Sequence, residues 1–220
     1  MSFLKNEDRK FVEDIFKTLK NNVKLVMFTQ EVECQYCRET RQILEEISTL
    51  SDKVDLNIFN FQLDKVQVQK YNIDKIPATV VLGEKDYGIR FYGIPSDYEF
   101  GSLIEDIVDV SRSDTNLSDD IKAQIAQINK PVHLQVFVTP TSPYCPAAVR
   151  LAHKLAITND YITADMIETT EFPHLAMRYN VNEVPRMVVN DAIPIEGALP
   201  EQIFVDKILE AFENNIFITK

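Results

Sequence analysis

The chain has 220 residues, of which 45% are hydrophobic and 26% charged, and these ordinary globular values exclude wholesale disorder. Its 23 basic and 34 acidic residues give a net charge of −11, which argues against a nucleic-acid partner, because such a protein needs cations that neutralise phosphates. No apolar run approaches the roughly 20 residues of a membrane span, and the N-terminal residues lack the apolar stretch of a signal peptide, so we expect a cytoplasmic protein without a membrane partner.

The residue pattern of the first half predicts helices and strands in alternation. A helix with apolar residues at helical spacing comes first, and an apolar strand at 23–28 then leads into Cys34-Gln35-Tyr36-Cys37. After a second helix, alternating apolar residues predict a strand at 54–58, and a short polar helix leads to Ile76-Pro77. Two strands around a turn and an amphipathic helix at 99–110 complete the half.

The second half repeats this order at an offset of 108 residues. Ser142-Pro143-Tyr144-Cys145 stands where the first half has its two cysteines, and Val184-Pro185 stands where it has Ile76-Pro77. A polar stretch at 111–120 separates the copies, and Ser118 is the expected N-cap of the helix that follows it. We interpret the chain as a tandem duplication with one unit at 1–112 and a second at 118–220, their sheets continuous or adjacent.

The pair Cys34 and Cys37 has the spacing of a dithiol that exchanges with disulfides. A first sulfur at a helix N-terminus is favoured as the thiolate, so Cys34 is the expected nucleophile and Cys37 the resolving thiol. Such exchange needs no metal and no other cofactor than the redox-active disulfide itself. Zinc is disfavoured because all three histidines lie in the other half.

Each half also has a proline 40 residues after its last motif cysteine. An X-Pro bond adopts the cis form at little cost, and a cis proline exposes the preceding backbone groups to an extended substrate chain. We therefore expect Ile76, Pro77, Val184 and Pro185 to bind substrate. Tyr36 and Tyr144 either line the same grooves or are surface aromatics.

A dithiol combined with such a proline is the thioredoxin-type arrangement, and the chain resembles the glutaredoxin-like protein disulfide oxidoreductases of thermophilic archaea and bacteria. The resemblance covers nearly the whole chain and rests on Cys34-Gln35-Tyr36-Cys37, on Ile76-Pro77 and Val184-Pro185, and on the segments 85–90, 92–95 and 159–163. It implies an α/β protein of two tandem thioredoxin-like folds, each a mixed sheet flanked by helices. It also implies exchange with protein disulfides and dithiols, reduction by a thioredoxin-reductase-like flavoenzyme, and electron supply to peroxiredoxins.

The sequence departs from the pattern of this family at one position, and from many thioredoxins at another. Ser142 replaces the first cysteine of the second motif, and because a serine hydroxyl is not a competent nucleophile for disulfide exchange, the second site is expected to be disabled or altered. Ser142 is either natural or an engineered substitution, and Cys145 is either inert packing or the remnant of an active site. Phe28 stands where many thioredoxins place a buried aspartate, which leaves proton transfer to Glu33, Lys24 or water.

Two other functions remain open. One is a relay that passes electrons from a flavoenzyme to a peroxiredoxin, since the N-terminal module of bacterial peroxiredoxin reductases is also a double thioredoxin fold with one active Cys-x-x-Cys, although there in the second copy. The other is a non-catalytic chaperone or scaffold that binds unfolded chains beside Pro77. A chaperone would retain its activity after Cys34→Ser.

Overall fold

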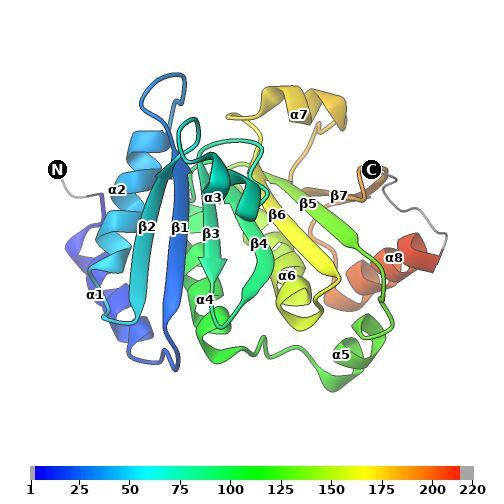
Figure 1. Ribbon diagram of the computed structural model, residues 1–220. Helices are drawn as coiled ribbons and strands as arrows, with labels where there is room; N and C mark the ends of the chain where they lie inside the picture. Colours follow the sequence, from blue (N-terminus) through cyan, green and yellow to red (C-terminus); the bar gives the residue numbers. More distant parts are fainter. Residues whose placement is uncertain (1–2, 214–220) are drawn as a thin grey trace.

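The computed structural model describes residues 3–213, and these fold into one eight-stranded sheet with helices packed against it (Figure 1). The first half contains, in order, α1 (Asn6–Phe16), β1 (Val23–Thr29), α2 (Cys37–Ser48), β2 (Val54–Asn60), α3 (Lys65–Lys70), β3 (Ala78–Leu82), β4 (Asp86–Tyr92) and α4 (Tyr98–Arg112). The second contains α5 (Asp119–Ile125), β5 (Val132–Val138), α6 (Cys145–Thr158), β6 (Ile162–Glu168), α7 (Pro173–Arg178), β7 (Arg186–Val189), β8 (Ile193–Glu196) and α8 (Glu201–Glu213). The predicted fold class and the predicted order of elements are confirmed.

The two halves share a single sheet because β4 pairs with β6. The strand order is β2-β1-β3-β4-β6-β5-β7-β8, and the β4–β6 pair is parallel, from Ile89 opposite Ala164 to Tyr92 opposite Ile167. At the start of this pair the strands approach so closely that a Cβ on Gly88 would lie 2.8 Å from Thr163 Cγ2. Gly88 also has a φ of +78°, a conformation that glycine adopts without strain.

The connection between the halves is packed into the molecule. Thr115 and Leu117 are buried, and the Thr115 hydroxyl lies 3.1 Å from that of Thr158. Ser118 caps α5 as expected, accepting a hydrogen bond of 3.3 Å from the Ile121 amide. The division into units at 1–112 and 118–220 stays a prediction, and the outermost residues of both units, 1–2 and 214–220, lie outside the described residues.

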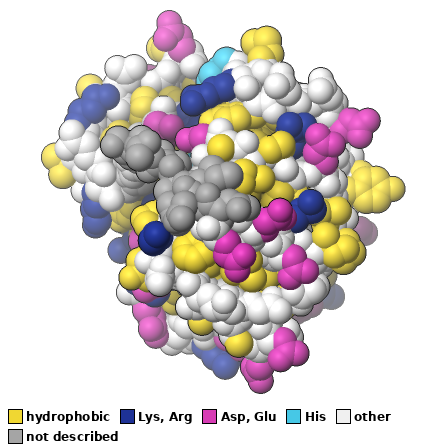
Figure 2. Space-filling view, turned by 90° about the vertical axis from the view of Figure 1, so that its right-hand side faces the viewer, with side chains coloured by type: hydrophobic (Ala, Val, Ile, Leu, Met, Phe, Trp, Pro, Cys, Tyr) yellow, Lys and Arg dark blue, Asp and Glu magenta, His cyan; other side chains and the backbone are white. Residues whose placement is uncertain are grey.

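Two hydrophobic cores lie on opposite faces of the sheet. The larger one is covered by α2, α4, α6 and α8, and the smaller one lies under α3 and α7. Successive residues of β1 supply them alternately, since Leu25 and Met27 belong to the larger core and Val26 and Phe28 to the smaller. No helix among the described residues is long and apolar enough to cross a bilayer. On the side that Figure 2 shows, charged side chains of both signs are scattered among apolar ones.

Ionisable side chains are buried where α4 packs on α6. His153 is fully buried, its Nδ1 lies 2.5 Å from Asp106 Oδ2, and its ring packs edge-on against Phe91 with the centroids 5.0 Å apart. Arg150 forms ion pairs with Asp106, with Asp109 and, at 3.0 Å, with Glu105. Burial and the neighbouring Arg150 charge lower the pKa of His153 to about 3, so the folded protein holds this side chain neutral.

We expect this histidine to make stability fall with acidification. The unfolded chain binds its proton below a pKa of 6.5, whereas the folded chain does not until a pKa of about 3, so stability present above pH 6.5 is lost as the pH falls. The contribution of one such group is about 1.4 kcal/mol per pH unit. Urea unfolding at pH 7 and pH 5 should show that His153→Gln loses less stability on acidification than the wild type. His174→Gln, which changes an exposed histidine, should lose as much stability as the wild type. An equal loss of stability in all three proteins would contradict the conclusion that the folded protein holds His153 neutral.

Candidate active site

Both sequence motifs lie at one edge of the sheet. Strands β1, β4, β5 and β6 run in the same direction, so their carboxyl ends meet there, and both motifs follow such ends. One row of neighbouring residues crosses six strands through Phe28, Ala78, Tyr92, Ile167, Phe137 and Arg186. The next row toward the edge contains Pro77, Gly93, Glu168 and Pro185. Since β1 and β5 are four strand spacings apart, the motifs are separated by about 20 Å along the edge.

The first motif forms a disulfide between Cys34 and Cys37. The expectation that Cys34 stands at the helix N-terminus needs a correction, because α2 begins at Cys37, with Tyr36 as its N-cap and a first hydrogen bond from the Thr40 amide to the Tyr36 carbonyl. Cys37 is buried, whereas Cys34 is half-buried in the preceding loop. The helix dipole therefore acts most directly on Cys37, and the more accessible sulfur is that of Cys34.

The two prolines are arranged alike. Both Ile76–Pro77 and Val184–Pro185 are cis peptide bonds, as the sequence predicts. Each proline carbonyl accepts a hydrogen bond of 2.9 Å from the amide of the glycine that directly follows the next strand, Gly93 for Pro77 and Gly197 for Pro185. In both halves the proline is buried and the residue before it half-buried. The role of these four residues in substrate binding stays a prediction.

The tyrosines of the two motifs differ in exposure. Tyr36 is half-buried and packs against the larger core, whereas the Tyr144 side chain is 68% exposed. Tyr36 is thus held in place beside the disulfide, and Tyr144 projects into solvent.

The second motif contains one buried thiol. Cys145 is fully buried at the first position of α6 and shares a hydrogen bond with the half-buried Ser142 side chain. Burial raises the pKa of the Cys145 thiol, and the hydrogen bond to Ser142 offsets only part of that rise. A buried thiol with a raised pKa is a poor nucleophile.

A carboxyl group from the first half acts electrostatically on this thiol. Glu99, in the first turn of α4, is fully buried, and its charge raises the pKa of Cys145 further. Burial raises the pKa of Glu99 itself to about 7, and the Ser102 hydroxyl offsets part of the rise. The start of α4 is held there by a hydrogen bond from the Tyr98 amide to the Pro140 carbonyl. Sequence reasoning missed Glu99, whose only signal is an acidic residue in the first turn of an amphipathic helix.

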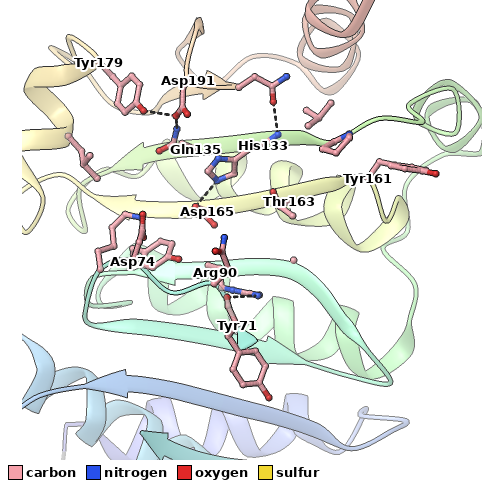
Figure 3. Close-up of a pocket in the computed structure, with 18 of the residues that line it drawn as sticks. Tyr71, Asp74, Arg90, His133, Gln135, Tyr161, Thr163, Asp165, Tyr179 and Asp191 are labelled. Atoms are coloured by element: carbon pink, nitrogen blue, oxygen red, sulfur yellow. Dashed lines mark hydrogen bonds and ion pairs between the residues drawn. The ribbon is translucent and has the colours of Figure 1, made fainter. Parts of the chain in front are cut away.

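A cavity of about 910 Å³ lies on the α3 and α7 face of the sheet, between residues of both halves (Figure 3). His133 Nε2 lies 2.7 Å from Asp165 Oδ2 at its floor, and the Tyr179 hydroxyl donates to Asp191 at 2.5 Å on its wall. Burial alone would lower the pKa of His133, but the Asp165 carboxylate outweighs it and the pKa is raised. None of the three cysteines lines this cavity. The described residues contain no group of three or more His, Cys, Asp or Glu side chains that could hold a metal ion.

Comparison with known proteins agrees with this geometry. Residues 132–210 match the family model of a thioredoxin domain. The structure superposes on a protein disulfide oxidoreductase from Aeropyrum pernix with a TM-score of 0.89 and 25% identity, covering 98% of this chain and 97% of that one. It also superposes on the alkylhydroperoxide reductase AhpF of Enterococcus faecalis with a TM-score of 0.87 and 25% identity, covering 94% and 99%. The expected resemblance to the protein disulfide oxidoreductases is confirmed.

Curated relatives are much longer than this chain. The chain is 27% identical over 128 residues to an NADH dehydrogenase of Bacillus subtilis, covering 57% of this chain and 25% of that protein. It is 25% identical over 172 residues to the alkyl hydroperoxide reductase AhpF of Staphylococcus aureus, covering 78% and 31%. The chain thus spans about a quarter to a third of the length of these relatives.

The burial of the cysteines predicts their reactivity. When the reduced, folded protein is treated with iodoacetamide, we expect Cys34 to be alkylated first and Cys145 to remain unmodified, because a buried thiol with a raised pKa presents almost no thiolate to solvent. Mass spectrometry of peptides after brief alkylation measures this order, and unfolding in urea should make all three cysteines reactive. Rapid modification of Cys145 in the folded protein would contradict the site geometry.

Proposed function

We propose that this redox enzyme, a protein disulfide oxidoreductase-like chain of the thioredoxin fold, exchanges disulfides with protein substrates through Cys34 as nucleophile and Cys37 as resolving thiol. The observation that carries the proposal is the Cys34–Cys37 disulfide at the same sheet edge as the cis Ile76–Pro77 segment. Cys34 is the more accessible of the two sulfurs, as an attacking group must be.

In the reducing direction, the Cys34 thiolate attacks one sulfur of a substrate disulfide. A mixed disulfide forms, and the other substrate sulfur leaves as a thiolate that takes up a proton. Cys37 then loses its proton and attacks the Cys34 sulfur, which forms the Cys34–Cys37 disulfide and releases the second substrate thiol. The enzyme dithiol is oxidised and the substrate disulfide reduced, so the redox-active disulfide is the only electron carrier. The oxidising direction is the reverse.

The groove beside the disulfide provides the binding surface in this proposal. The half-buried Ile76 leaves backbone groups for an extended substrate chain, and Tyr36 supplies an aromatic wall. In the second half, Val184, Pro185 and the exposed Tyr144 form the corresponding groove. Because Ser142 cannot act as a nucleophile and Cys145 is buried, that groove binds chains without exchanging disulfides.

A relay to a peroxiredoxin is the second candidate function. Its support is the likeness to the alkyl hydroperoxide reductases named AhpF, in sequence and, over 94% of this chain, in structure. In this version a thioredoxin-reductase-like flavoenzyme reduces Cys34–Cys37, and the dithiol reduces the peroxidase. A cytoplasmic location fits both versions, since a reducing compartment keeps the dithiol available. Insulin reduction with dithiothreitol alone favours the general oxidoreductase, and activity only with a flavoenzyme and a peroxiredoxin favours the relay.

Removing the nucleophile should abolish exchange. We expect Cys34→Ser to reduce the rate of insulin reduction by dithiothreitol at least 100-fold relative to the wild type, because the hydroxyl cannot replace the thiolate. Cys145→Ser is the matched control, since it also removes a thiol but lies in the second half, and its rate should stay within twofold. The proposal fails if Cys34→Ser keeps the wild-type rate.

Restoring a cysteine at position 142 tests why the second half is inactive. We expect Ser142→Cys to form a disulfide with Cys145, because the Ser142 side chain already reaches Cys145 by a hydrogen bond. The double variant Cys34→Ser, Ser142→Cys should recover insulin reduction to within about tenfold of the wild type. Intact mass should show a loss of two hydrogens on oxidation. If the mass change occurs without activity, the second groove lacks more than a nucleophile.

A further inference from the structure

The cavity on the α3 and α7 face lies over the junction of the two halves (Figure 3). Strand β6 stands between β4 and β5 and is parallel to both, and such a central strand is usually covered on both faces. Thr163 of β6 is nevertheless exposed, and Tyr161, just before the strand, is 49% exposed. The pairing of the halves therefore leaves an open site that neither half forms alone.

The sheet surface beneath this cavity changes from apolar to polar along the strands. The row of neighbours that runs through Tyr92, Ile167 and Phe137 belongs to the smaller core. Burying polar groups without hydrogen bonds is costly, so a polar surface suits a ligand that can form them. The polar residues of the floor are Arg90, Asp165 and Gln135 in the next row, and Thr163 and His133 in the row after it.

Each of the four carboxylates that line the cavity already has a donor within the chain. The pairs join Asp74 to Lys75, Asp160 to Lys85, Asp165 to His133, and Asp191 to both Tyr179 and Gln135. Arg90 is likewise committed, because two of its nitrogens bind the Asp86 carboxylate at 2.8 and 2.7 Å. A cationic ligand would therefore have to displace existing partners in order to bind.

Two cations of the cavity keep unused donors. Arg178 of α7 forms no hydrogen bond or ion pair with the described residues, and its guanidinium carbon lies 5.1 Å from the centroid of the Tyr179 ring. Lys75 places its ammonium 3.6 Å from the centroid of the Tyr92 ring and uses one of its three N–H groups on Asp74. The Lys75 side chain is only 14% exposed, whereas that of Asp74 is 73% exposed. The unused capacity of these side chains is that of donors, which favours an anion.

Aromatic side chains supply a second kind of surface. Figure 3 places Asp74 and Tyr179 toward one end of the cavity and Tyr161 toward the other. Lys75 follows Asp74 in the chain and Arg178 precedes Tyr179, so both cations belong to the end away from Tyr161. The exposed Tyr161 ring can stack on a flat apolar group.

We propose that this cavity binds a small aromatic anion, with its charged group toward Lys75 and Arg178 and its ring toward Tyr161. The volume of about 910 Å³ lies within the roughly 300–1,000 Å³ of small-molecule sites. Charge favours the same class of ligand, because four basic residues and His133 line the cavity beside four acidic ones, in a chain whose net charge is −11. No cysteine lines the cavity, so the inference does not depend on the proposed function.

Fluorescence titration with anilinonaphthalene sulfonate, an aromatic anion, tests the site. We expect saturable binding of one probe per chain, and naphthoate, which is also an aromatic anion, should displace the probe. Inorganic phosphate at the same concentration should not displace it, because phosphate lacks the apolar body. Absence of saturable binding, or displacement by phosphate, would overturn the proposal.

Substitutions of the two cations separate charge from hydrophobicity. Lys75→Gln and Arg178→Gln should each weaken binding of the sulfonate about tenfold, because each removes a charge-assisted hydrogen bond. Neither should change the affinity for phenylnaphthylamine, which has the same rings without the sulfonate. Lys65→Gln is the matched control, since Lys65 also lies over an aromatic ring, that of Phe61 at 5.2 Å, but does not line the cavity. Wild-type affinity of both cavity variants for the sulfonate would contradict the proposal.

Filling the cavity locates the site independently of charge. Thr163→Phe adds bulk to the exposed floor and should abolish binding of both probes while insulin reduction continues at the wild-type rate. Unchanged binding of the sulfonate by this variant would place the probe elsewhere and overturn the inference. If Thr163→Phe does not fold, as judged by circular dichroism, the affinities of Lys75→Gln and Arg178→Gln decide the question. Failure of the wild type to reduce insulin would count against the proposed function alone.

Discussion

The parallel pairing of β4 with β6 is the constraint on which the rest of the structure depends. It turns two sheets into one and fixes Tyr92 opposite Ile167, so that the carboxyl ends of the strands in both halves share one edge. Parallel strands are usually covered on both faces, and here helices α4 and α6 cover one face of the junction while the cavity opens on the other. The position of each motif therefore depends on a contact between halves rather than on its own half alone.

The helices above this junction are held by buried charges. Asp106, Arg150 and His153 are almost completely removed from water, and their mutual contacts offset part of the desolvation cost. Removing one partner of such a buried pair typically costs about 3–5 kcal/mol, because the remaining charge is left uncompensated. A slipped packing of α4 on α6 would separate these partners. The network thus penalises alternative arrangements of the two halves.

The elements and the motif residues could be predicted because their signals are local. Alternating or helical spacing of apolar residues marks each strand and helix, and the repeat at one offset identifies Pro77 and Pro185 as equivalent. The start of α2 at Cys37 rather than Cys34 was missed, because the conformation of the preceding loop, with Glu33 at a φ of 59°, has no clear sequence signal. Helix boundaries are the least determined part of such a pattern.

The carboxyl groups at the site could not be predicted because their partners lie in the other half. Glu171 accepts a hydrogen bond from the Ile94 amide, 77 residues away in the chain, and the charge of Glu99 raises the pKa of Cys145, which also lies in the other half. These interactions depend on the β4–β6 register, which cannot be predicted from either half of the sequence alone. The burial of His153 has the same origin, since the helix face that carries it is covered only when α4 packs there.

Each half places a carboxyl group against the other half, and these contacts do not require a cysteine at position 142. Glu99 is held by the packing of α4, and Pro185 by the hydrogen bond to Gly197, so neither depends on a cysteine at position 142. A serine there removes the exchange chemistry but few of the contacts that position the second groove. The loop that carries Glu171 likewise binds the Ile94 amide of the first half by a hydrogen bond. The second half therefore contacts the segment after β4 that lies next to Pro77, independently of any redox chemistry of its own.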